Sequence, residues 1–433
     1  MRDIWGVIDI GTRQVRVLIG QPDVHGRVSV LGAGIAPAEG IDDRGVANIE
    51  RMASSINKAI QQATQQSGAI LQRVWVGLSH SDLRGESTQA IITFPQEDHE
   101  ITLEDLERLR LQAVQRPLPP DMELIHAIPQ TYHLDSRQDV RDPVGMSGIR
   151  LEGQFYLVYA PQTHLNMLRR CFQRLKLEVE GFVSRAIIAA EALLSPELKS
   201  SGVGFLYLGA HSTAVVLYAD GILRHFSVLP LGGHLVTMDI REALRVIMPT
   251  QAEALKIQEG VARSSQVSEE EILRLRLPGQ PGPLDVRKRF LAQVIEARLE
   301  EILLFVAKEI EKAQLLRRLY GGVYLAGGGA LMRDIESLVE YVLGERAVRV
   351  DIRPLLGRGL IEGVNTPQMA GAVALLHTVP MLREFLPPLP PSASGKKRKD
   401  AFPAPSSKPS GKLLSKLRSI LENNLKISQD LID

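Results

Sequence analysis

One arrangement of strands occurs twice in this chain of 433 residues. Near the N-terminus, two runs rich in β-branched residues, 6–8 and 15–19, flank the turn Asp9-Ile10-Gly11-Thr12, and a third strand is expected at 27–33. The same order of strand, turn, strand and strand returns at 203–229. A unit that recurs in this way predicts an α/β fold duplicated into two similar lobes.

The first of these turns has the chemistry of a phosphate site. Gly11 tolerates positive φ and lets backbone N–H groups approach an anion, Thr12 offers a hydroxyl, and Asp9 can hold Mg²⁺ through water. The alternative is an ordinary hairpin in which Asp and Gly serve only the turn.

Apolar residues at helical spacing complete the first unit. They recur every three or four positions from Asn48 to Ala63, and a short apolar strand follows at 73–78. The region therefore predicts three strands, a helix and a strand. Further along, Thr102 and Asp105 have the spacing of a capping box, which predicts the start of another helix.

The second half of the chain contains a glycine run between regular elements. A helix-rich stretch at 236–260 and a long helix around 294–319 precede a strand at 323–326. This strand enters Gly327-Gly328-Gly329, and a helix is expected from Leu331 onward. That order would point backbone amides and a helix N-terminus at one spot, as an anion or nucleotide site requires.

Composition removes several classes of function. Lys and Arg number 51 against 50 Asp and Glu, so the charge balance of +1 gives no reason to expect nucleic acid as a partner. Cys171 is the single cysteine, which excludes an internal disulfide and fits a reducing cytosol. No run approaches the ~20 apolar residues of a membrane-spanning helix, and the first residues lack the core of a signal peptide. A soluble or peripheral protein is expected.

The last fifty residues differ from the rest. The stretch 386–410 contains seven prolines and the basic run 396–399, which predicts a disordered spacer. Beyond it, 411–427 predicts an amphipathic helix that a membrane interface or a partner's groove would bury. The alternative is a helix that folds back onto the protein. The residues expected at the membrane are Leu413, Leu414, Lys416, Leu417, Arg418, Ile420 and Leu421.

Several separated motifs together resemble the actin/Hsp70-like ATPase superfamily. The turn at 9–12 is similar to its first phosphate loop, 325–330 to its adenosine loop, and Glu253 with Lys256 to a pair facing ribose and adenine. The resemblance implies ATP and Mg²⁺ as cofactors, with Asp9 as the metal residue. It implies as cofactor-binding residues Asp9, Gly11, Thr12, Arg13, Gly209, Ser212, Gly233, Glu253, Lys256, Gly327, Gly328 and Gly329.

Within this superfamily the chain resembles the FtsA family of bacterial cell-division proteins. The segments 126–132 and 142–150 look like the signature of the subdomain that this family inserts, and Pro230-Leu231-Gly232-Gly233 is also similar. The resemblance implies a first lobe at 1–80 and 166–200, an inserted α/β subdomain at 81–165, a second lobe at 201–380, a linker at 381–410 and a membrane-targeting helix at 411–427.

The same resemblance implies a function. Such a protein binds ATP, polymerises with itself and recruits the C-terminal tail of the tubulin-like protein FtsZ. It would lie at the cytoplasmic face of the cell membrane at the division site, bound peripherally to anionic lipid and to other divisome proteins.

The second phosphate loop departs from the family. Where the family has Asp-x-Gly-Gly-Gly-Thr, this chain has Tyr207-Leu208-Gly209-Ala210-His211-Ser212. A phenol cannot orient Mg²⁺-bound water as a carboxylate would, so weakened or altered ATP binding and slow or absent hydrolysis are expected. A rebuilt but functional loop is the alternative. Glu191 falls roughly where actin-like proteins keep a residue near the attacking water, although an acid on an Ala-rich helix is more often a solvated or capping residue.

Three other functions stay open. A pilus-assembly adaptor similar to PilM shares the superfamily but typically lacks the terminal amphipathic helix. An ATPase or sugar-kinase-type enzyme is disfavoured by Tyr207. A nucleotide-free membrane scaffold differs in that neither co-purified nucleotide nor a thermal shift with ATP would be seen.

Overall fold

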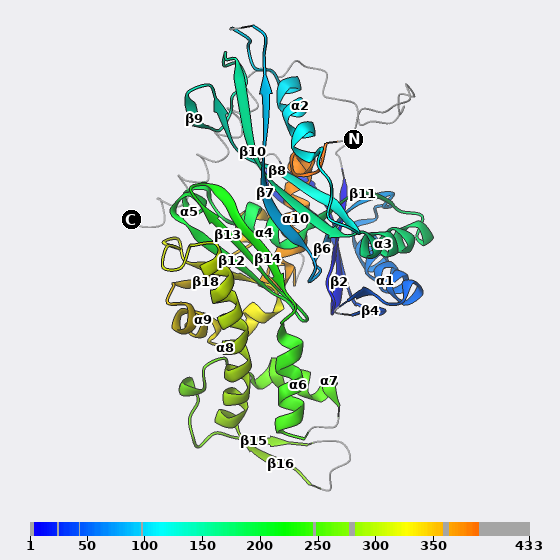
Figure 1. Cartoon of the computed structure of the whole chain (residues 1–433). Helices are drawn as coiled ribbons and strands as arrows, with labels where there is room; N and C mark the ends of the chain where they lie inside the picture. The colour runs from blue at the N-terminus through cyan, green and yellow to red at the C-terminus, as the bar shows by residue number, and fades with distance from the viewer. Residues whose placement is uncertain are drawn as a thin grey trace.

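The computed structural model describes residues 4–23, 26–42, 44–96, 98–245, 248–276, 282–357 and 363–388. Two five-stranded sheets form the centre, a four-stranded sheet lies at one end, and a small region with the hairpin of β15 (Ile272–Leu275) and β16 (Leu284–Arg287) lies at the other (Figure 1). The terminal helix expected at 411–427, and most of the linker before it, lie outside the described residues.

The first sheet has the strand order β11-β6-β1-β2-β3. β1, β2 and β3 are antiparallel neighbours, whereas β6 lies parallel to β1 and β11 parallel to β6. Asn48 caps α1, its side chain accepting the N–H of Arg51 at 3.0 Å. The elements are β1 (Trp5–Ile10), β2 (Gln14–Pro22), β3 (Val28–Pro37), β4 (Ile41–Asp42), β5 (Gly45–Val46), α1 (Ile49–Ser67), β6 (Arg73–Leu78), α3 (Gln162–Arg174), β11 (Glu178–Ser184), α4 (Arg185–Leu193) and α5 (Pro196–Ser201).

The second sheet repeats this plan with the order β14-β13-β12-β17-β18. Three antiparallel strands are again followed by two parallel ones, so the predicted duplication is confirmed. The elements of this lobe are β12 (Val203–Leu208), β13 (Thr213–Ala219), β14 (Ile222–Leu229), α6 (Gly233–Ala243), α7 (Pro249–Glu259), α8 (Lys288–Lys312), β17 (Val323–Ala326), α9 (Ile335–Leu343) and β18 (Ala347–Arg349), with short 3₁₀ turns at Ser264–Gln266, Gly328–Leu331, Arg353–Leu355 and Pro367–Met369.

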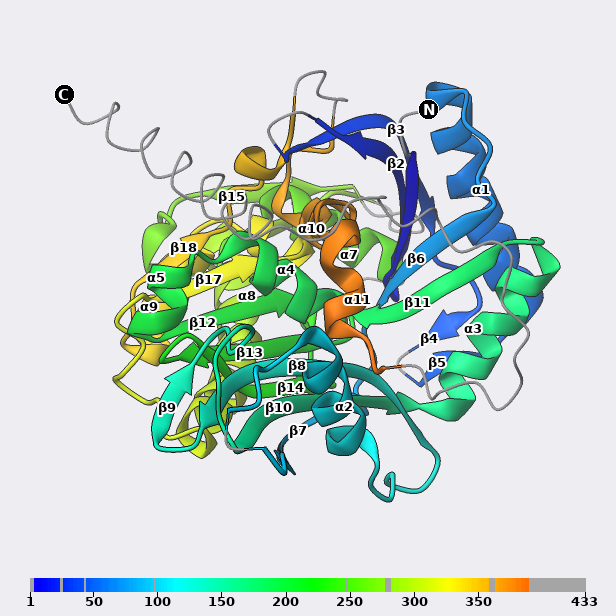
Figure 2. The same ribbon diagram turned by 90° about the horizontal axis from the view of Figure 1, so that it is seen from above.

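Two helices lie between the two sheets. α4 contacts β12 and β13, and α10 (Ala370–Thr378) contacts α4 together with β1 and β2 (Figure 2). Residues 370–376 are all buried, because apolar neighbours surround α10 on every side. The second lobe expected at 201–380 includes α10, yet α10 packs on the first sheet. The boundary at 380 therefore does not follow the packing.

The four-stranded sheet belongs to the inserted segment. β7 (Arg84–Thr93), β8 (Met122–Leu134), β9 (Arg137–Val140) and β10 (Arg150–Pro161) pair in the order β7-β10-β8-β9, and α2 (Leu103–Val114) packs on β7 and β10. Thr102 Oγ1 accepts the N–H of Asp105 at 3.3 Å while Asp105 Oδ2 accepts the N–H of Thr102 at 3.0 Å. The predicted capping box is therefore present.

Two helix boundaries differ from those expected. α8 covers Lys288–Lys312 rather than 294–319, and it ends just before Gln314, whose φ of 58° lies in the left-handed region. The helix expected from Leu331 begins only at Ile335. Asp334 has a φ of 58°, which separates α9 from the preceding 3₁₀ turn.

The end of the described chain is held by the inserted subdomain. A 3₁₀ turn, Val379–Met381, leads from α10 to α11 (Leu382–Phe385). Arg110 Nη2 on α2 donates to the carbonyl oxygens of Glu384, at 2.6 Å, and Leu386. Residues 382–385, the first part of the linker expected from 381, thus form a packed helical turn. No helix within the described ranges is long and apolar enough to cross a membrane.

Candidate functional site

The two turns singled out by the sequence face each other across the lobes. One follows β1 and the other follows β12, at equivalent ends of the duplicated sheets. His211 Nδ1 lies 3.0 Å from Thr12 Oγ1, and the hydroxyls of Ser79 and Ser212 are 3.4 Å apart. The cavity that these residues line measures only ≈ 10 Å³. His211 therefore fills most of the space between the two turns.

Asp9 is fully buried at this junction and is surrounded by arginines. Its Oδ2 lies 3.6 Å from Arg16 Nη1 and its Oδ1 lies 3.5 Å from Arg185 Nη1. Arg185 comes from the first turn of α4, and only 5% of it is exposed. A single carboxylate therefore faces two guanidinium groups.

Tyr207, the residue that replaces the family's aspartate, packs against this cluster. The Arg185 guanidinium carbon lies 4.7 Å from the centre of its ring, a cation–π geometry. Its hydroxyl lies beside Gly371 at the start of α10, where an added Cβ would come within 3.0 Å. Burial, and then the charge of Asp9, raise the pKa of Tyr207, so the phenol stays protonated.

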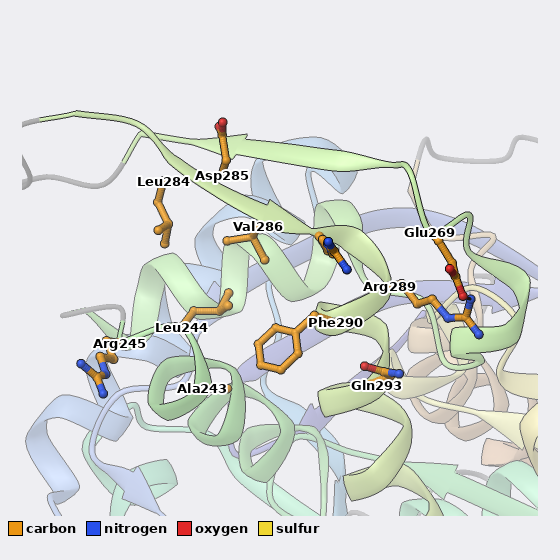
Figure 3. A pocket seen from close by; sticks show the side chains of 11 residues that line it. Ala243, Leu244, Arg245, Glu269, Leu284, Asp285, Val286, Arg289, Phe290 and Gln293 are labelled. Carbon is orange, nitrogen blue, oxygen red and sulfur yellow. Dashed lines mark hydrogen bonds and ion pairs between the residues drawn. The ribbon is translucent and has the colours of Figure 1, made fainter.

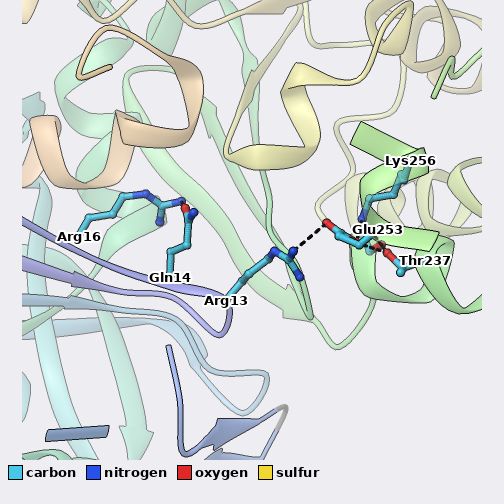
Figure 4. A network of polar contacts seen from close by, with 7 residues as sticks. Arg13, Gln14, Arg16, Thr237, Glu253 and Lys256 are labelled. Carbon is cyan, nitrogen blue, oxygen red and sulfur yellow. Dashed lines mark hydrogen bonds and ion pairs between the residues drawn. The ribbon is translucent and has the colours of Figure 1, made fainter. Parts of the chain in front are cut away.

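A second set of predicted residues lies on α6 and α7 (Figure 4). Lys256 Nζ donates to the Gly233 carbonyl at 2.7 Å and pairs with Glu253 Oε2 at 2.7 Å. Burial opposes ionisation of Glu253, but Lys256, Thr237 and Arg13 together hold its pKa below the usual value. Gly233 N–H also donates to the Gly209 carbonyl at 3.0 Å, which joins α6 to the second loop.

The glycine run has a structural role in part. Gly327 has a φ of 89°, and a Cβ there would lie 2.5 Å from the carbonyl oxygen of Leu208. Its N–H donates to Pro367 at 2.9 Å. That amide is thus already used, and α9 begins six residues after Gly329. The glycines lie at the cleft, but the expected helix N-terminus does not meet them there.

Glu191 is not brought to the loops. It lies near the opposite end of α4 from Arg185, where Lys199 Nζ pairs with its Oε1 at 2.7 Å and the Tyr218 hydroxyl donates to its Oε2 at 2.9 Å. Both carboxylate oxygens of Glu191 are therefore engaged by neighbouring side chains. Six residues of helix, about 9 Å along the axis, separate it from Arg185.

Arg16 and Arg185 are the residues that the motifs missed. Arg185 directly follows β11 and begins α4. Because β11, β6 and β1 are parallel, their carboxyl ends meet at one edge of the sheet, and Arg185 therefore lies at the same edge as the end of β1. Ligands in open α/β sheets bind at that edge. An assignment of 178–184 as a parallel strand would have indicated Arg185, but glutamates and a glycine hide the strand pattern.

These neighbours do not fit a magnesium ion at Asp9. Mg²⁺ demands near-octahedral oxygen coordination and usually takes one or two carboxylates, whereas both oxygens of Asp9 face guanidinium nitrogens. Tyr207 supplies no second carboxylate. In the part of the chain that the structure describes, no group of three or more His, Cys, Asp or Glu side chains is placed to hold a metal ion.

The donors present at this junction match the chemistry of phosphate oxygens. The Nε atoms of Arg16 and Arg185 and the hydroxyl of Tyr207 are buried without a hydrogen-bond partner within the described ranges. Guanidinium groups bind phosphate oxygens well because their N–H groups match the spacing of those oxygens. The cluster therefore carries unused capacity for an anion.

A larger pocket of ≈ 630 Å³ lies away from the loops, between α6, the β15–β16 hairpin and the start of α8 (Figure 3). Leu244, Val286 and the half-exposed ring of Phe290 supply apolar surface. Its lining also contains Glu269 and Asp285, which pair with Arg289 and Arg274, while Arg245 and Arg287 add positive charge at the edge. The arrangement suits a peptide that carries both apolar and acidic side chains.

Comparison with known proteins gives matches along most of the chain. A family model described as the SHS2 domain inserted in FTSA matches residues 81–159, and one described as cell division protein FtsA matches 205–374. The chain is 31% identical to cell division protein FtsA of Bacillus subtilis (strain 168), over 87% of this chain and 83% of the relative. It is 30% identical to cell division protein FtsA of Pseudomonas aeruginosa, over 85% and 87%.

Solved structures show the same fold at low identity. The PilM–PilN type IV pilus biogenesis complex aligns with a TM-score of 0.63 and 17% identity, over 89% of this chain and 98% of the other. MreB5 of Spiroplasma citri bound to ADP aligns with a TM-score of 0.53 and 12% identity, over 88% and 97%. The two-lobed actin-like architecture is thereby established.

Proposed function

This chain belongs to the FtsA family of cell division proteins, and on that premise we propose that it binds ATP, polymerises and attaches FtsZ filaments to the cytoplasmic membrane. The observation that carries the nucleotide part is the cluster of Arg16, Arg185 and Tyr207, whose buried donors lack partners within the described ranges between two phosphate-type loops. MreB5 of Spiroplasma citri, which shares this fold, binds ADP, and this supports a nucleotide in the equivalent cleft.

The pocket at Phe290 is the proposed site for the C-terminal tail of FtsZ. Its apolar floor and its basic edge at Arg245 and Arg287 favour a tail with acidic and apolar side chains. Binding of a labelled tail peptide should weaken about tenfold in Phe290→Ala or Arg245→Ala. The matched control is Leu304→Ala, which removes an exposed apolar side chain from the same helix outside the pocket. Equal loss in the control would contradict this site.

The segment 411–427 is the proposed membrane contact. Six large apolar side chains recur on one face, each contributing ~1.5 kcal/mol or more when fully buried. Each nearby Lys or Arg adds about 1 kcal/mol at an anionic surface. Together these contributions to the binding free energy suffice for reversible binding at the cytoplasmic face of the membrane, even if only half of the apolar contribution is obtained.

Pelleting with anionic liposomes tests the whole proposal. The full chain should pellet with liposomes, and FtsZ should co-pellet only when the chain is present. Leu417→Glu places a charge on the apolar face and should abolish pelleting, whereas the control Ser419→Glu places the same charge on the opposite face and should weaken it much less. Unchanged pelleting after deletion of 412–433 would reject the anchor. Repeating the assay with ATP reports whether nucleotide favours polymers on the membrane.

One observation favours a second candidate, a nucleotide-free scaffold. The space between the loops at Thr12 and His211 is only ≈ 10 Å³, so nucleotide binding requires the lobes to separate. A thermal shift with ATP distinguishes the two: a rise in the unfolding temperature supports the clamp, and no change at millimolar ATP supports the scaffold.

A further inference from the structure

We propose that the guanidinium of Arg185 takes the place of the divalent cation in the nucleotide site, so that the phosphates of ATP or ADP bind without Mg²⁺. The inference rests on the proposed function, because a nucleotide has to bind in the cleft. It concerns which cation that nucleotide meets there.

The position of Arg185 is the first reason. A Cβ added to Gly11 would lie 3.0 Å from Arg185 Nη1, and one added to Gly209 would lie 3.6 Å from Nη2. Gly11 belongs to the first phosphate loop and Gly209 to the second. A single guanidinium therefore spans the gap between the two loops, where the proposed function puts the phosphates.

The local charge is the second reason. Asp9 with Arg16 and Arg185 sums to +1, from one negative and two positive groups. A divalent cation on one carboxylate also sums to +1, so the cluster presents the same net charge to an incoming anion. Arg185 is nine-tenths buried, so its side chain is held in place, and a guanidinium keeps its charge in proteins.

Tyr207 is the third reason, because its side chain is matched to Arg185. The guanidinium lies 4.7 Å over the phenol ring, and the neutral ring leaves Arg185 its full charge. A carboxylate at this position would pair with Arg185 and would also offer a metal its second ligand. Tyrosine at position 207 therefore supplies no metal ligand, and its ring instead packs against the guanidinium of Arg185.

The unused donors are the fourth reason. Arg185 Nε and the Tyr207 hydroxyl are buried without hydrogen-bond partners in the described parts of the chain, and the Arg185–Asp9 contact is long at 3.5 Å. Guanidinium has five N–H donors in a planar fork, and phosphate oxygens are acceptors of matching geometry. An entering phosphate would satisfy these groups directly, without metal-bound water.

The test compares nucleotide binding in excess EDTA with binding in excess MgCl₂, using calorimetry with ATP and with ADP on the full chain. The dissociation constants in the two conditions should agree within a factor of about two. Binding that is about tenfold or more tighter with Mg²⁺ overturns this inference and leaves the proposed function intact. No binding in either condition overturns both.

Variants sharpen the assignment. Arg185→Ala should weaken binding in EDTA by about tenfold or more, while Arg170→Ala, which removes an exposed arginine from α3 of the same lobe, should leave it unchanged. The double variant Arg185→Ala with Tyr207→Asp presents two carboxylates and keeps only Arg16 of the two guanidinium groups at Asp9. It should bind more tightly with Mg²⁺ than with EDTA, and a double variant indifferent to Mg²⁺ would overturn the placement of Arg185 at the cation position.

Discussion

Arg13 Nη2 lies 3.7 Å from Glu253 Oε1, and this contact joins the first phosphate loop to α7 of the opposite lobe (Figure 4). Glu253 is held in turn by Lys256 and Thr237. Arg13 is more than half exposed, so its end of the contact is free to move. The pair is therefore a weak contact between the two lobes.

Arg13→Ala should loosen the cleft without unfolding the protein. An ion pair with one exposed partner contributes less than about 1 kcal/mol, so the free energy of unfolding in urea should change by less than that. Amide exchange in the turn at 11–13 and in α7 should rise. The control is Arg51→Ala, which removes an exposed partner of Glu39 within the first lobe. A similar rise in that control would mean that the effect is not specific to the cleft.

Arg110→Ala should detach α11 from the inserted subdomain. Arg110 donates to several carbonyl oxygens at the end of this helix, and hydrogen bonds of a charged group contribute about 1.5–3 kcal/mol. The free energy of unfolding should fall by about that amount, and limited proteolysis should cut near 382–386. Arg108→Ala, on the same helix but more than half exposed, should cost less than about 1 kcal/mol. Equal costs would contradict the assignment.

His126 should make stability fall as the pH is lowered. Burial, reinforced by Arg110, lowers the pKa of His126 to about 4 despite its contact with the Phe385 carbonyl. Between pH ~6.5 and ~4 the unfolded chain binds a proton that the folded protein does not, so stability decreases through that window and is constant above it.

The loss from His126 at about pH 5 is about 2 kcal/mol relative to neutral pH. His126→Gln should reduce the difference in unfolding free energy between those two conditions by that amount, whatever its effect at neutral pH. Urea titrations of both proteins at the two pH values measure it. An unchanged difference would show that His126 is not neutral in the folded protein.

Hydrolysis of ATP should stay near background. The pKa of Tyr207 is raised by burial and by Asp9, so the phenol cannot accept a proton from water, and Glu191 is engaged elsewhere. Steady-state release of phosphate measures this, with and without liposomes. Tyr207→Asp alone should not restore turnover while Arg185 remains. Turnover comparable to that of actin-type ATPases would refute the prediction.

The sequence was sufficient for the fold wherever local pattern and packing agree. The duplicated strands were predictable because β1, apart from Asp9, and β12 consist almost wholly of apolar residues, as strands covered on both faces require. The cap at Asn48 and the capping box at Thr102 follow from local chemistry alone. The end of α8 was not predictable, because left-handed φ at Gln314 has no residue-type signal.

The two loops of the candidate site were predictable from the sequence, but the arginines beside Asp9 were not. Thr12 and Ser212 were found through turn motifs, since a turn is encoded by adjacent residues. Arg185 contacts Asp9 only because β11 pairs with β6 in the folded sheet. The spacing of the two residues in the sequence does not predict this contact. For the same reason α10, far along the chain, could not be placed beside β1 before the sheets were assembled.

The held end of the described chain has a mechanical consequence. Residues 370–385 form one continuous helical segment, from Gly371, beside Asp9, to Phe385, beside His126. Tension on the chain beyond Pro388 is received first at the Arg110 end of this segment. A pull at Pro388 and a change at Asp9 would therefore act on opposite ends of the same helical segment.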